Sequence, residues 1–191
     1  MARFAAVVLT GGSGSRLGGA DKAALEYAGQ TLLERALAAL AEATETVVVG
    51  PETRVSRPVI FTRESPPSGG PAAGLLAGRD ALSEPVDLVV VLAVDMPLVT
   101  AATVRRLCAA ADGHDGALLV DSSGRRQLAG ALRVAALDGA RPPSGDEDGL
   151  PMHRLLGSLD LAAVAGEEGE PRDVDTWADL HELHDLRDPP R

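Results

Sequence analysis

Aromatic residues are almost absent from this sequence: they make up 2% of its 191 residues, whereas hydrophobic residues make up 45%. Alanine, valine and leucine must therefore fill the core, and the chain lacks the aromatic platforms on which single-stranded nucleic-acid binders stack bases. The single cysteine, Cys108, cannot form an internal disulfide. No apolar run reaches the ~18 residues of a membrane helix, and the first residues lack the features of a signal peptide. We therefore expect a cytoplasmic protein that does not enter membranes.

Positive charge is also scarce. The chain has 18 Lys and Arg residues against 28 Asp and Glu residues, which gives a formal net charge of -10 and a pI of about 4.8. Such a surface repels the phosphate backbone of nucleic acids and anionic membranes. We expect neither nucleic-acid nor membrane partners, and an anionic ligand must meet a local cluster of cations.

Segments typical of strands and of helices alternate along the chain, and this alternation favours an α/β fold with a mostly parallel sheet covered on both faces. The length fits a single hydrophobic core, so we expect one domain over residues 1–184 and a C-terminal tail at 185–191. Thr100 suits the N-cap of the third helix. The expected strands are 4–9, 46–50, 59–62, 88–94, 117–120 and 161–165, and the expected helices are 31–43, 72–82, 101–111 and 176–186.

Ligands of such sheets bind beyond the carboxyl ends of the strands, so the segments that follow the apolar runs are the candidates for a site. The segment after the first run is rich in glycine and reads LTGGSGSRLGGADK over residues 9–22. Its glycines allow backbone N–H groups to approach an anion, and Arg16 and Lys22 supply positive charge. This composition favours a phosphate-binding loop, although a flexible surface loop is the alternative. The other candidate segments are 63–71, 95–97 and 172–176.

Two common glycine-rich motifs do not fit this loop. Counted from Gly12 and Gly14, the third glycine of a dinucleotide-binding fingerprint falls on Leu17. A P-loop also fails, because residues 14–19 are followed by Ala20 and Asp21 rather than by Lys and Ser or Thr.

The order and spacing of four motifs resemble those of the molybdenum cofactor guanylyltransferases, the MobA family. Leu-x-Gly-Gly is followed by Arg-x-Gly-Gly-x-Asp-Lys, and the other motifs lie at 63–75, 94–97 and 173–176. The resemblance implies a three-layer Rossmann-like sandwich of the nucleotide-diphospho-sugar transferase type. The implied reaction transfers GMP from GTP to the terminal phosphate of molybdopterin, giving the guanine dinucleotide cofactor and pyrophosphate. The chain departs from the family at Gly50, which is often Asn, at Glu64, which is usually Asp, and at Trp177, which is usually Pro.

The resemblance also implies roles for individual residues. Asp95, directly after an apolar run, would bind Mg²⁺ through a hard carboxylate oxygen, and Asp175 would supply a second carboxylate. Arg16 and Lys22 would neutralise the charge that builds on the α-phosphate and on the departing pyrophosphate. The residues expected to bind the nucleotide are Leu9, Thr10, Gly11, Gly12, Lys22, Glu64, Gly74 and Asp95.

Several alternatives stay open from the sequence. Asp95 could be a plain turn carboxylate, and Asp173 and Asp175 could cap a helix. Arg125, Arg126 and Gln127 could form a merely charged and polar surface, or could contact the phosphate or pterin of the acceptor. A CTP-dependent or sugar-phosphate nucleotidyltransferase is the nearest rival function, and a non-catalytic nucleotide- or cofactor-binding protein is a second. Transient contact with molybdoenzymes or their chaperones is compatible with the main function.

Overall fold

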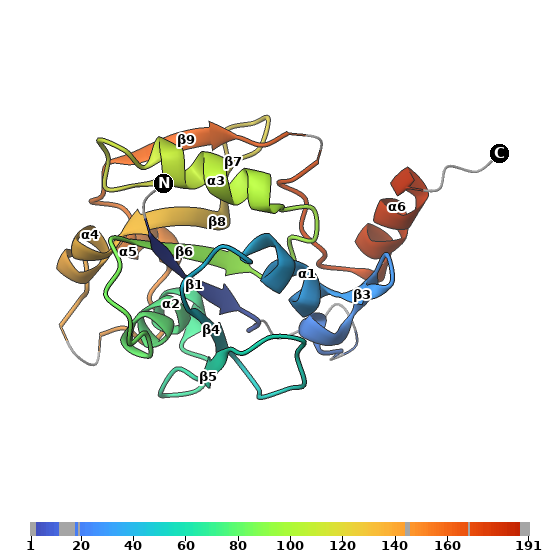
Figure 1. Cartoon of the computed structure of the whole chain (residues 1–191), viewed down its shortest axis with the longest axis horizontal. Helices are drawn as coiled ribbons and strands as arrows, with labels where there is room; N and C mark the ends of the chain where they lie inside the picture. The colour runs from blue at the N-terminus through green and yellow to red at the C-terminus, as the bar shows by residue number, and fades with distance from the viewer. Residues whose placement is uncertain (1–2, 12–17, 19, 144–145, 168, 188–191) are drawn as a thin grey trace.

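The computed structural model describes residues 3–11, 18, 20–143, 146–167 and 169–187. Its central element is a seven-stranded sheet with the strand order β5-β4-β1-β6-β8-β7-β9 (Figure 1). All seven strands run in the same direction except β8, which is antiparallel to β6 and β7. The mostly parallel sheet predicted from the sequence is therefore confirmed. The strands are β1 (Phe4–Leu9), β4 (Thr46–Val49), β5 (Ile60–Thr62), β6 (Leu88–Ala93), β7 (Gly116–Val120), β8 (Arg126–Arg133) and β9 (Leu161–Ala165).

Helices cover both faces of this sheet, as Figure 1 shows. Side chains alternate along β1: Ala6 and Val8 belong to the cluster that contains α1 and α3, whereas Val7 and Leu9 pack with α2. This alternation divides the core into two layers, because successive side chains of a strand point to opposite faces. The three-layer α/β architecture is thus confirmed. The helices are α1 (Leu32–Ala39) and α3 (Ala101–Ala110) on one face, with α2 (Gly70–Asp80), α4 (Val134–Gly139) and α5 (Met152–Leu155) on the other.

Strand β8 was not predicted, and its composition explains why. Its middle reads Leu-Ala-Gly-Ala-Leu, and alanine and glycine are depleted in strands. Pairing with its neighbours holds it in place, with Val90 opposite Ala131 and Leu118 opposite Gly130. A Cβ at Gly130 would overlap the side chain of Leu118 and would lie 2.7 Å from the Ala117 carbonyl oxygen, so the close approach of backbone here favours glycine.

Helix α6 (Trp177–Arg187) packs against the short hairpin formed by β2 (Glu26–Tyr27) and β3 (Gln30–Thr31). The Tyr27 hydroxyl donates to the Leu183 carbonyl oxygen at 3.4 Å, and the rings of Tyr27 and His184 lie 5.3 Å apart. This contact brings the segment before α6 close to the segment before the hairpin, so that Asp175 meets Lys22, 153 positions earlier in the chain.

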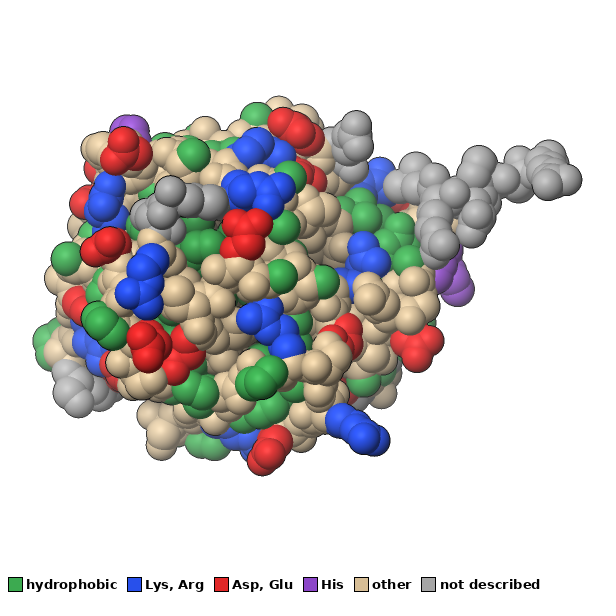
Figure 2. Space-filling view, in the orientation of Figure 1, with side chains coloured by type: hydrophobic (Ala, Val, Ile, Leu, Met, Phe, Trp, Pro, Cys, Tyr) green, Lys and Arg blue, Asp and Glu red, His purple; other side chains and the backbone are tan. Residues whose placement is uncertain are grey.

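Acidic and basic side chains are interspersed on the face shown in Figure 2, rather than gathered by sign. Many arginines at the surface pair with carboxylates, as in the exposed Arg105 with Glu42 at 2.5 Å and the partly buried Arg141 with Asp80 at 2.6 Å. Such pairs leave few cations to attract an anion over a broad surface. In the part of the chain that the structure describes, no helix is both long and apolar enough to cross a membrane.

Candidate active site

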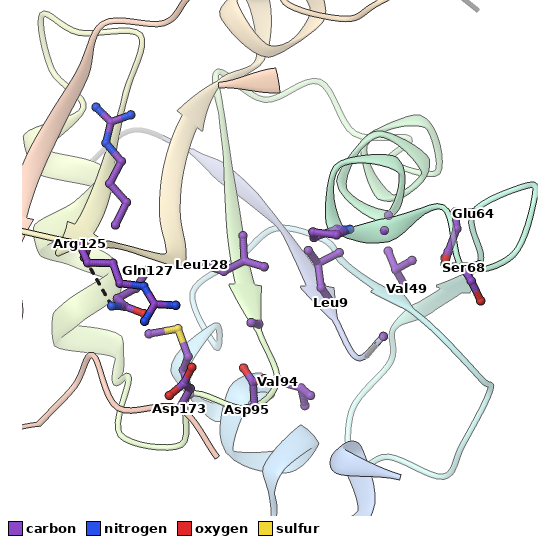
Figure 3. A pocket seen from close by; sticks show the side chains of 17 residues that line it. Leu9, Val49, Glu64, Ser68, Val94, Asp95, Arg125, Gln127, Leu128 and Asp173 are labelled. Carbon is purple, nitrogen blue, oxygen red and sulfur yellow. Dashed lines mark hydrogen bonds between the residues drawn. The ribbon is translucent and has the colours of Figure 1, made fainter. Parts of the chain in front are cut away.

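A cavity of about 640 Å³ lies at the edge of the sheet where β1, β4 and β6 end and β8 begins (Figure 3). This is the edge at which parallel α/β sheets bind ligands. The end of β6 contributes Asp95, and the last loop contributes Asp173, which lies beside it. Glu64 and Ser68 lie across the cavity from these carboxylates. The four predicted loops therefore converge here, together with the start of β8.

Lys22 lies between two carboxylates beside the cavity. Its Nζ donates to Asp95 Oδ2 at 2.8 Å and to Asp175 Oδ1 at 2.6 Å, and its side chain is only 10% exposed. Burial alone would lower the pKa of Lys22, but the hydrogen bonds to Asp175 and Asp95 outweigh it and raise the pKa above its usual value. Lys22 is also the only lysine among 18 basic residues. Its compact ammonium has three donors, and two of them bridge the two carboxylates.

Alternation in the last loop places its two aspartates. Val174 is fully buried, and its N–H donates to the Asp95 carbonyl oxygen at 2.8 Å. In an extended segment the residues on either side of a buried one point the opposite way, so Asp173 and Asp175 face the site. This pattern of acid, apolar and acid residues is a signal that could have placed both carboxylates from the sequence.

Thr176 and Asp179 form the cap at the start of α6. The Thr176 hydroxyl accepts from the Asp179 N–H at 3.2 Å, and the Asp179 carboxylate accepts from the N–H groups of Thr176 and Asp175 at 2.7 and 2.9 Å. This reciprocal arrangement is a capping box. The Asp175 carboxylate itself accepts from Lys22, which favours the predicted site role over the capping alternative.

Negative charge is concentrated at the end of the cavity where Asp95 and Asp173 lie. Burial raises the pKa of the Asp173 carboxyl, and the nearby charges of Asp175 and Asp95 add to the rise. Repulsion among these acids would be relieved by a bound cation, and carboxylate oxygens are the ligands that hard divalent cations prefer. Within the described residues, no three acidic, His or Cys side chains form a complete protein cage for a metal. Mg²⁺ commonly binds through one or two carboxylates together with substrate phosphates and water, and the Asp95 and Asp175 pair fits that mode.

The start of β8 supplies the positive side of the cavity through Arg125 and Arg126. Asp121 organises the turn before them: its Oδ1 accepts from the N–H groups of Ser123 and Arg125 at 2.8 and 3.0 Å, and its Oδ2 accepts from Gln127 Nε2 at 3.2 Å. The Ser123 hydroxyl, which donates to Oδ1 at 2.6 Å, is the main cause that holds the pKa of the Asp121 carboxyl below its usual value, and the N–H groups of Arg125 and Ser123 add to it. The sequence alone left the role of residues 125–127 open, although the Asp-Ser-Ser-Gly segment at 121–124, between two apolar runs, is typical of a hairpin turn.

The base of the cavity explains one departure from the resembling family. Leu9 and Val49 line the cavity, and Thr10 is buried with its hydroxyl donating to the Val49 carbonyl oxygen at 2.9 Å. A Cβ at Gly50 would overlap the Thr10 hydroxyl. The asparagine that the family often carries at this position is therefore incompatible with Thr10 in its present place.

The remaining predicted residues belong to the loops around the cavity. Glu64 lines it and accepts from the Ser68 N–H at 3.1 Å. Gly74, on α2, also lines the cavity, and a Cβ there would meet Leu9 Cδ2 at 3.3 Å. The N-terminus of α2, at Gly70, faces the cavity and favours an anion through its backbone N–H groups and helix dipole. Gly11 lines the cavity, whereas the predicted residues Gly12 and Arg16 lie outside the described residues.

Residues 6–164 match the family of the MobA-like NTP transferase domain. The chain belongs to this family.

Two relatives have similar sequences. A probable molybdenum cofactor guanylyltransferase of Methanosarcina acetivorans is 36% identical to this chain, over 59% of this chain and 55% of its own length. The molybdenum cofactor guanylyltransferase of Mesorhizobium japonicum is 36% identical over 68% of this chain and 66% of its own length. The chain thus spans less than two thirds of either relative.

Two solved structures share the fold. Molybdopterin-guanine dinucleotide biosynthesis protein A of Archaeoglobus fulgidus aligns with a TM-score of 0.73 and 19% identity over 95% of this chain and 97% of that one. The Rv0371c protein of Mycobacterium tuberculosis, in complex with manganese, aligns with a TM-score of 0.68 and 19% identity over 95% of this chain and 97% of that one.

Proposed function

We propose that this protein transfers GMP from GTP to the phosphate of molybdopterin, which forms the guanine dinucleotide cofactor and releases pyrophosphate. The observation that carries the proposal is the position of Lys22 between Asp95 and Asp175, at the cavity edge and next to the glycine-rich loop. The names of the two relatives support the choice of GTP and molybdopterin.

We propose Mg²⁺ as the cofactor, with Asp95 and Asp175 as its protein ligands. When bound, the metal would neutralise the negative charge of the phosphates. The manganese complex of the Mycobacterium tuberculosis protein supports a divalent cation on this fold. Lys22, which holds both carboxylates in this structure, would then turn to the phosphates as their cation.

The chain's own residues would position the two substrates and stabilise charge. Leu9, Thr10, Gly11 and Gly12 would contact the nucleotide from the first loop, and Glu64 and Gly74 from the second. The N-terminus of α2 favours the anionic triphosphate. Such transfers need positioning and charge neutralisation more than a protein nucleophile.

In the transfer step, an oxygen of the acceptor phosphate attacks the α-phosphorus of GTP. A bond forms between that oxygen and the α-phosphorus, and the bond from the α-phosphorus to the bridging oxygen breaks. Pyrophosphate leaves with the electron pair. The attacking oxygen of a phosphate monoester is already deprotonated at neutral pH, because the second pKa of such a group is about 6, so no proton has to be removed from it. Lys22 and Arg16 would neutralise the charge that grows on the departing oxygens, and Arg125 would hold the acceptor phosphate.

We propose that residues 1–184 form one nucleotidyltransferase domain in the cytoplasm, with 185–191 as a tail. Leu183 of α6 is 1% exposed in the same hydrophobic cluster as β1, which supports including the chain at least to this residue in the domain. Helix α6 itself continues to Arg187, past the proposed boundary. Delivery of the product would involve transient contact with molybdoenzymes or their chaperones.

Pyrophosphate release from each of the four ribonucleoside triphosphates, with and without molybdopterin, tests the function. We expect release from GTP only when molybdopterin is present. Preferential release from CTP would replace the guanylyl assignment with a cytidylyl one. Tight nucleotide binding without release under any condition would favour a non-catalytic binding protein.

A further inference from the structure

Arg35, in helix α1, contacts the turn that follows Asp95. Its Nε donates to the Pro97 carbonyl oxygen at 3.0 Å, although the two residues are 62 positions apart in sequence. The segment between β6 and α3 consists of turns that belong to neither element. A side chain from a helix therefore holds this segment where strand and helix hydrogen bonds do not.

The same guanidinium also lies over the ring of Tyr27, in the β2–β3 hairpin. The central carbon of the guanidinium is 4.8 Å from the centroid of the ring, which is the geometry of a cation–π contact. Tyr27 is 6% exposed, and it contacts Leu183 and His184 of α6 through its hydroxyl and its ring. Arg35 thus connects the end of β6 with the hairpin against which α6 packs, and Figure 1 shows α1 between them.

This connection concerns the site because the two carboxylates that share Lys22 lie on different segments. Asp95 follows β6, and Asp175 precedes α6. The Lys22 ammonium and the hydrogen bond from Val174 N–H to the Asp95 carbonyl oxygen join the two segments at the site itself. Arg35 adds a link outside the site, to the first segment directly and to the second through the hairpin.

We propose that Arg35 is a positioning residue that sets the spacing between Asp95 and Asp175, and thereby the affinity of this pair for a divalent cation. The inference rests on the proposed function, which assigns the two carboxylates to Mg²⁺. A guanidinium is itself a cation and cannot be a metal ligand, so Arg35 acts through Pro97 and Tyr27. Its charge alone would repel a nearby metal. The sign of the effect therefore separates positioning, which strengthens metal binding, from simple electrostatics, which weakens it.

Three variants test the proposal. Arg35→Met keeps a long side chain but removes the donor and the charge. Arg35→Lys is the conservative variant, because its ammonium keeps both the donor to Pro97 and the positive charge. Arg57→Met is the matched control: Arg57 is also partly buried, and it donates to the carbonyl oxygens of Leu37 and Leu40 at the other end of α1, both at 3.2 Å. Melting curves establish that each protein is folded.

Mn²⁺ binding is measured by electron paramagnetic resonance in the presence of a GTP analogue with a methylene group between its α- and β-phosphorus. This analogue allows no transfer, so the measurement does not depend on turnover. We expect Arg35→Met to weaken Mn²⁺ binding by about tenfold, as is usual when a residue that orients a metal ligand is lost. Arg35→Lys should recover part of the affinity, and Arg57→Met should match the wild type.

Unchanged or tighter Mn²⁺ binding in a folded Arg35→Met protein overturns the proposal, as does an equal loss in Arg57→Met. Arg35→Gln, with a shorter polar side chain, replaces Arg35→Met if the latter does not fold, and the same outcomes apply to it.

A second measurement separates this proposal from the proposed function, because it uses neither metal nor nucleotide. Lys22 is the sole lysine, so ¹⁵N NMR can follow the exchange of its ammonium protons with water in isolation. Two hydrogen bonds and 10% exposure protect these protons in the wild type. We expect exchange to be severalfold faster in Arg35→Met and unchanged in Arg57→Met. If the wild type binds no Mn²⁺ with the analogue, the metal assignment fails, whereas faster exchange in Arg35→Met alone still supports the positioning role. Equal exchange rates in all three proteins overturn that role.

Discussion

At the residue scale, the bridge from Asp95 through Lys22 to Asp175 dominates the site. The three residues are separated by 73 and 153 positions in sequence, and two hydrogen bonds join them. A buried ammonium with two carboxylate partners is electrostatically satisfied in the absence of substrate. Removal of any one member therefore changes the charge balance of the site as well as one contact.

Asp95→Asn keeps the shape of the side chain but removes the charge proposed to hold Mg²⁺. We expect turnover to fall by about two to four decades while the protein stays folded. Turnover as a function of Mg²⁺ concentration, together with a melting curve, measures this. Asp112→Asn is the control, since the Asp112 side chain is 95% exposed.

Near-normal turnover of a folded Asp95→Asn protein at limiting Mg²⁺ would refute the metal role. We expect a smaller loss for Asp175→Asn, whose side chain is 45% exposed compared with 22% for Asp95. An equal loss at the two positions would mean that both carboxylates act equally on the metal.

Lys22→Ala should reduce the single-turnover rate more than it reduces GTP affinity, because charge moves to the pyrophosphate oxygens only as the bond breaks. Single-turnover pyrophosphate release and GTP titration on the same preparation measure the two effects. Loss of affinity with a normal saturated rate would make Lys22 an anchor of the ground state instead.

The sole lysine also gives a direct spectroscopic reading of the same residue. In protein labelled with ¹³C at the lysine ε-carbon, NMR should show one side-chain signal, which reports only Lys22. We expect this signal to shift when GTP and Mg²⁺ are added together, as the ammonium turns from the carboxylates to the phosphates. If the signal does not shift when GTP and Mg²⁺ are added, Lys22 does not move from the carboxylates to the phosphates.

At the scale of elements, the turn between β7 and β8 presents the arginines to the cavity. Its geometry depends on one exposed carboxylate: Asp121 accepts from Ser123, Arg125 and Gln127. Gly124, with φ 81°, completes the turn in a backbone conformation that favours glycine. The positions of Arg125 and Gln127 are thus fixed by the hydrogen bonds of this turn and not by burial in the core.

Asp121→Ala should therefore raise the KM for molybdopterin by about tenfold without changing GTP affinity, since a small misplacement of substrate-positioning groups is costly. Steady-state kinetics at saturating GTP measures the KM, and kcat is read from the same curves. Asp121→Asn, which keeps one acceptor oxygen, should recover part of the loss. A parallel loss of GTP affinity would show that Asp121 supports the whole site rather than the acceptor side.

At the scale of the whole molecule, a buried acid joins α3 to the segment after β9. Glu170 is 7% exposed, and it accepts from the Thr103 hydroxyl at 2.5 Å and from Arg106 at 2.6 Å. Burial alone would raise the pKa of Glu170, but the hydrogen bonds from Arg106 and its neighbours outweigh it and lower the pKa below 4.5. The folded state therefore binds the Glu170 proton more weakly than the unfolded state does.

This difference predicts an acid-sensitive stability. The contribution of Glu170 is complete above its ordinary pKa of 4.5 and is lost as the pH falls through the lower pKa of the folded state. We expect the free energy of unfolding of Glu170→Gln to fall less steeply below pH 4.5 than that of the wild type. Urea unfolding at a series of pH values measures this, with the half-exposed Glu84 as the control position for the same substitution. Parallel curves for wild type and Glu170→Gln would contradict the prediction.

The sequence by itself determined the layered α/β fold and the edge of the sheet at which the site forms. Apolar runs and helical spacing are local patterns, and the alternation of strands and helices leaves few topologies. The same local signals placed Thr100 at the N-cap of α3, where its hydroxyl accepts from the Thr103 N–H. They also placed Asp95 directly after a buried strand, which is why its position in the site could be predicted.

Only the tertiary structure decided which side chains meet. Asp175 reaches Lys22 because α6 packs against the β2–β3 hairpin, and no local pattern records a contact across 153 positions. Strand β8 exists through pairing with β6 and β7 despite its alanine and glycine, and it carries Arg126 and Gln127 to the cavity. Gly50 stands where the resembling family often has asparagine, and only the folded structure shows that a Cβ at this position would overlap the Thr10 hydroxyl. Contacts of this kind depend on packing between segments that are distant in sequence, and such packing is a property of the folded chain as a whole.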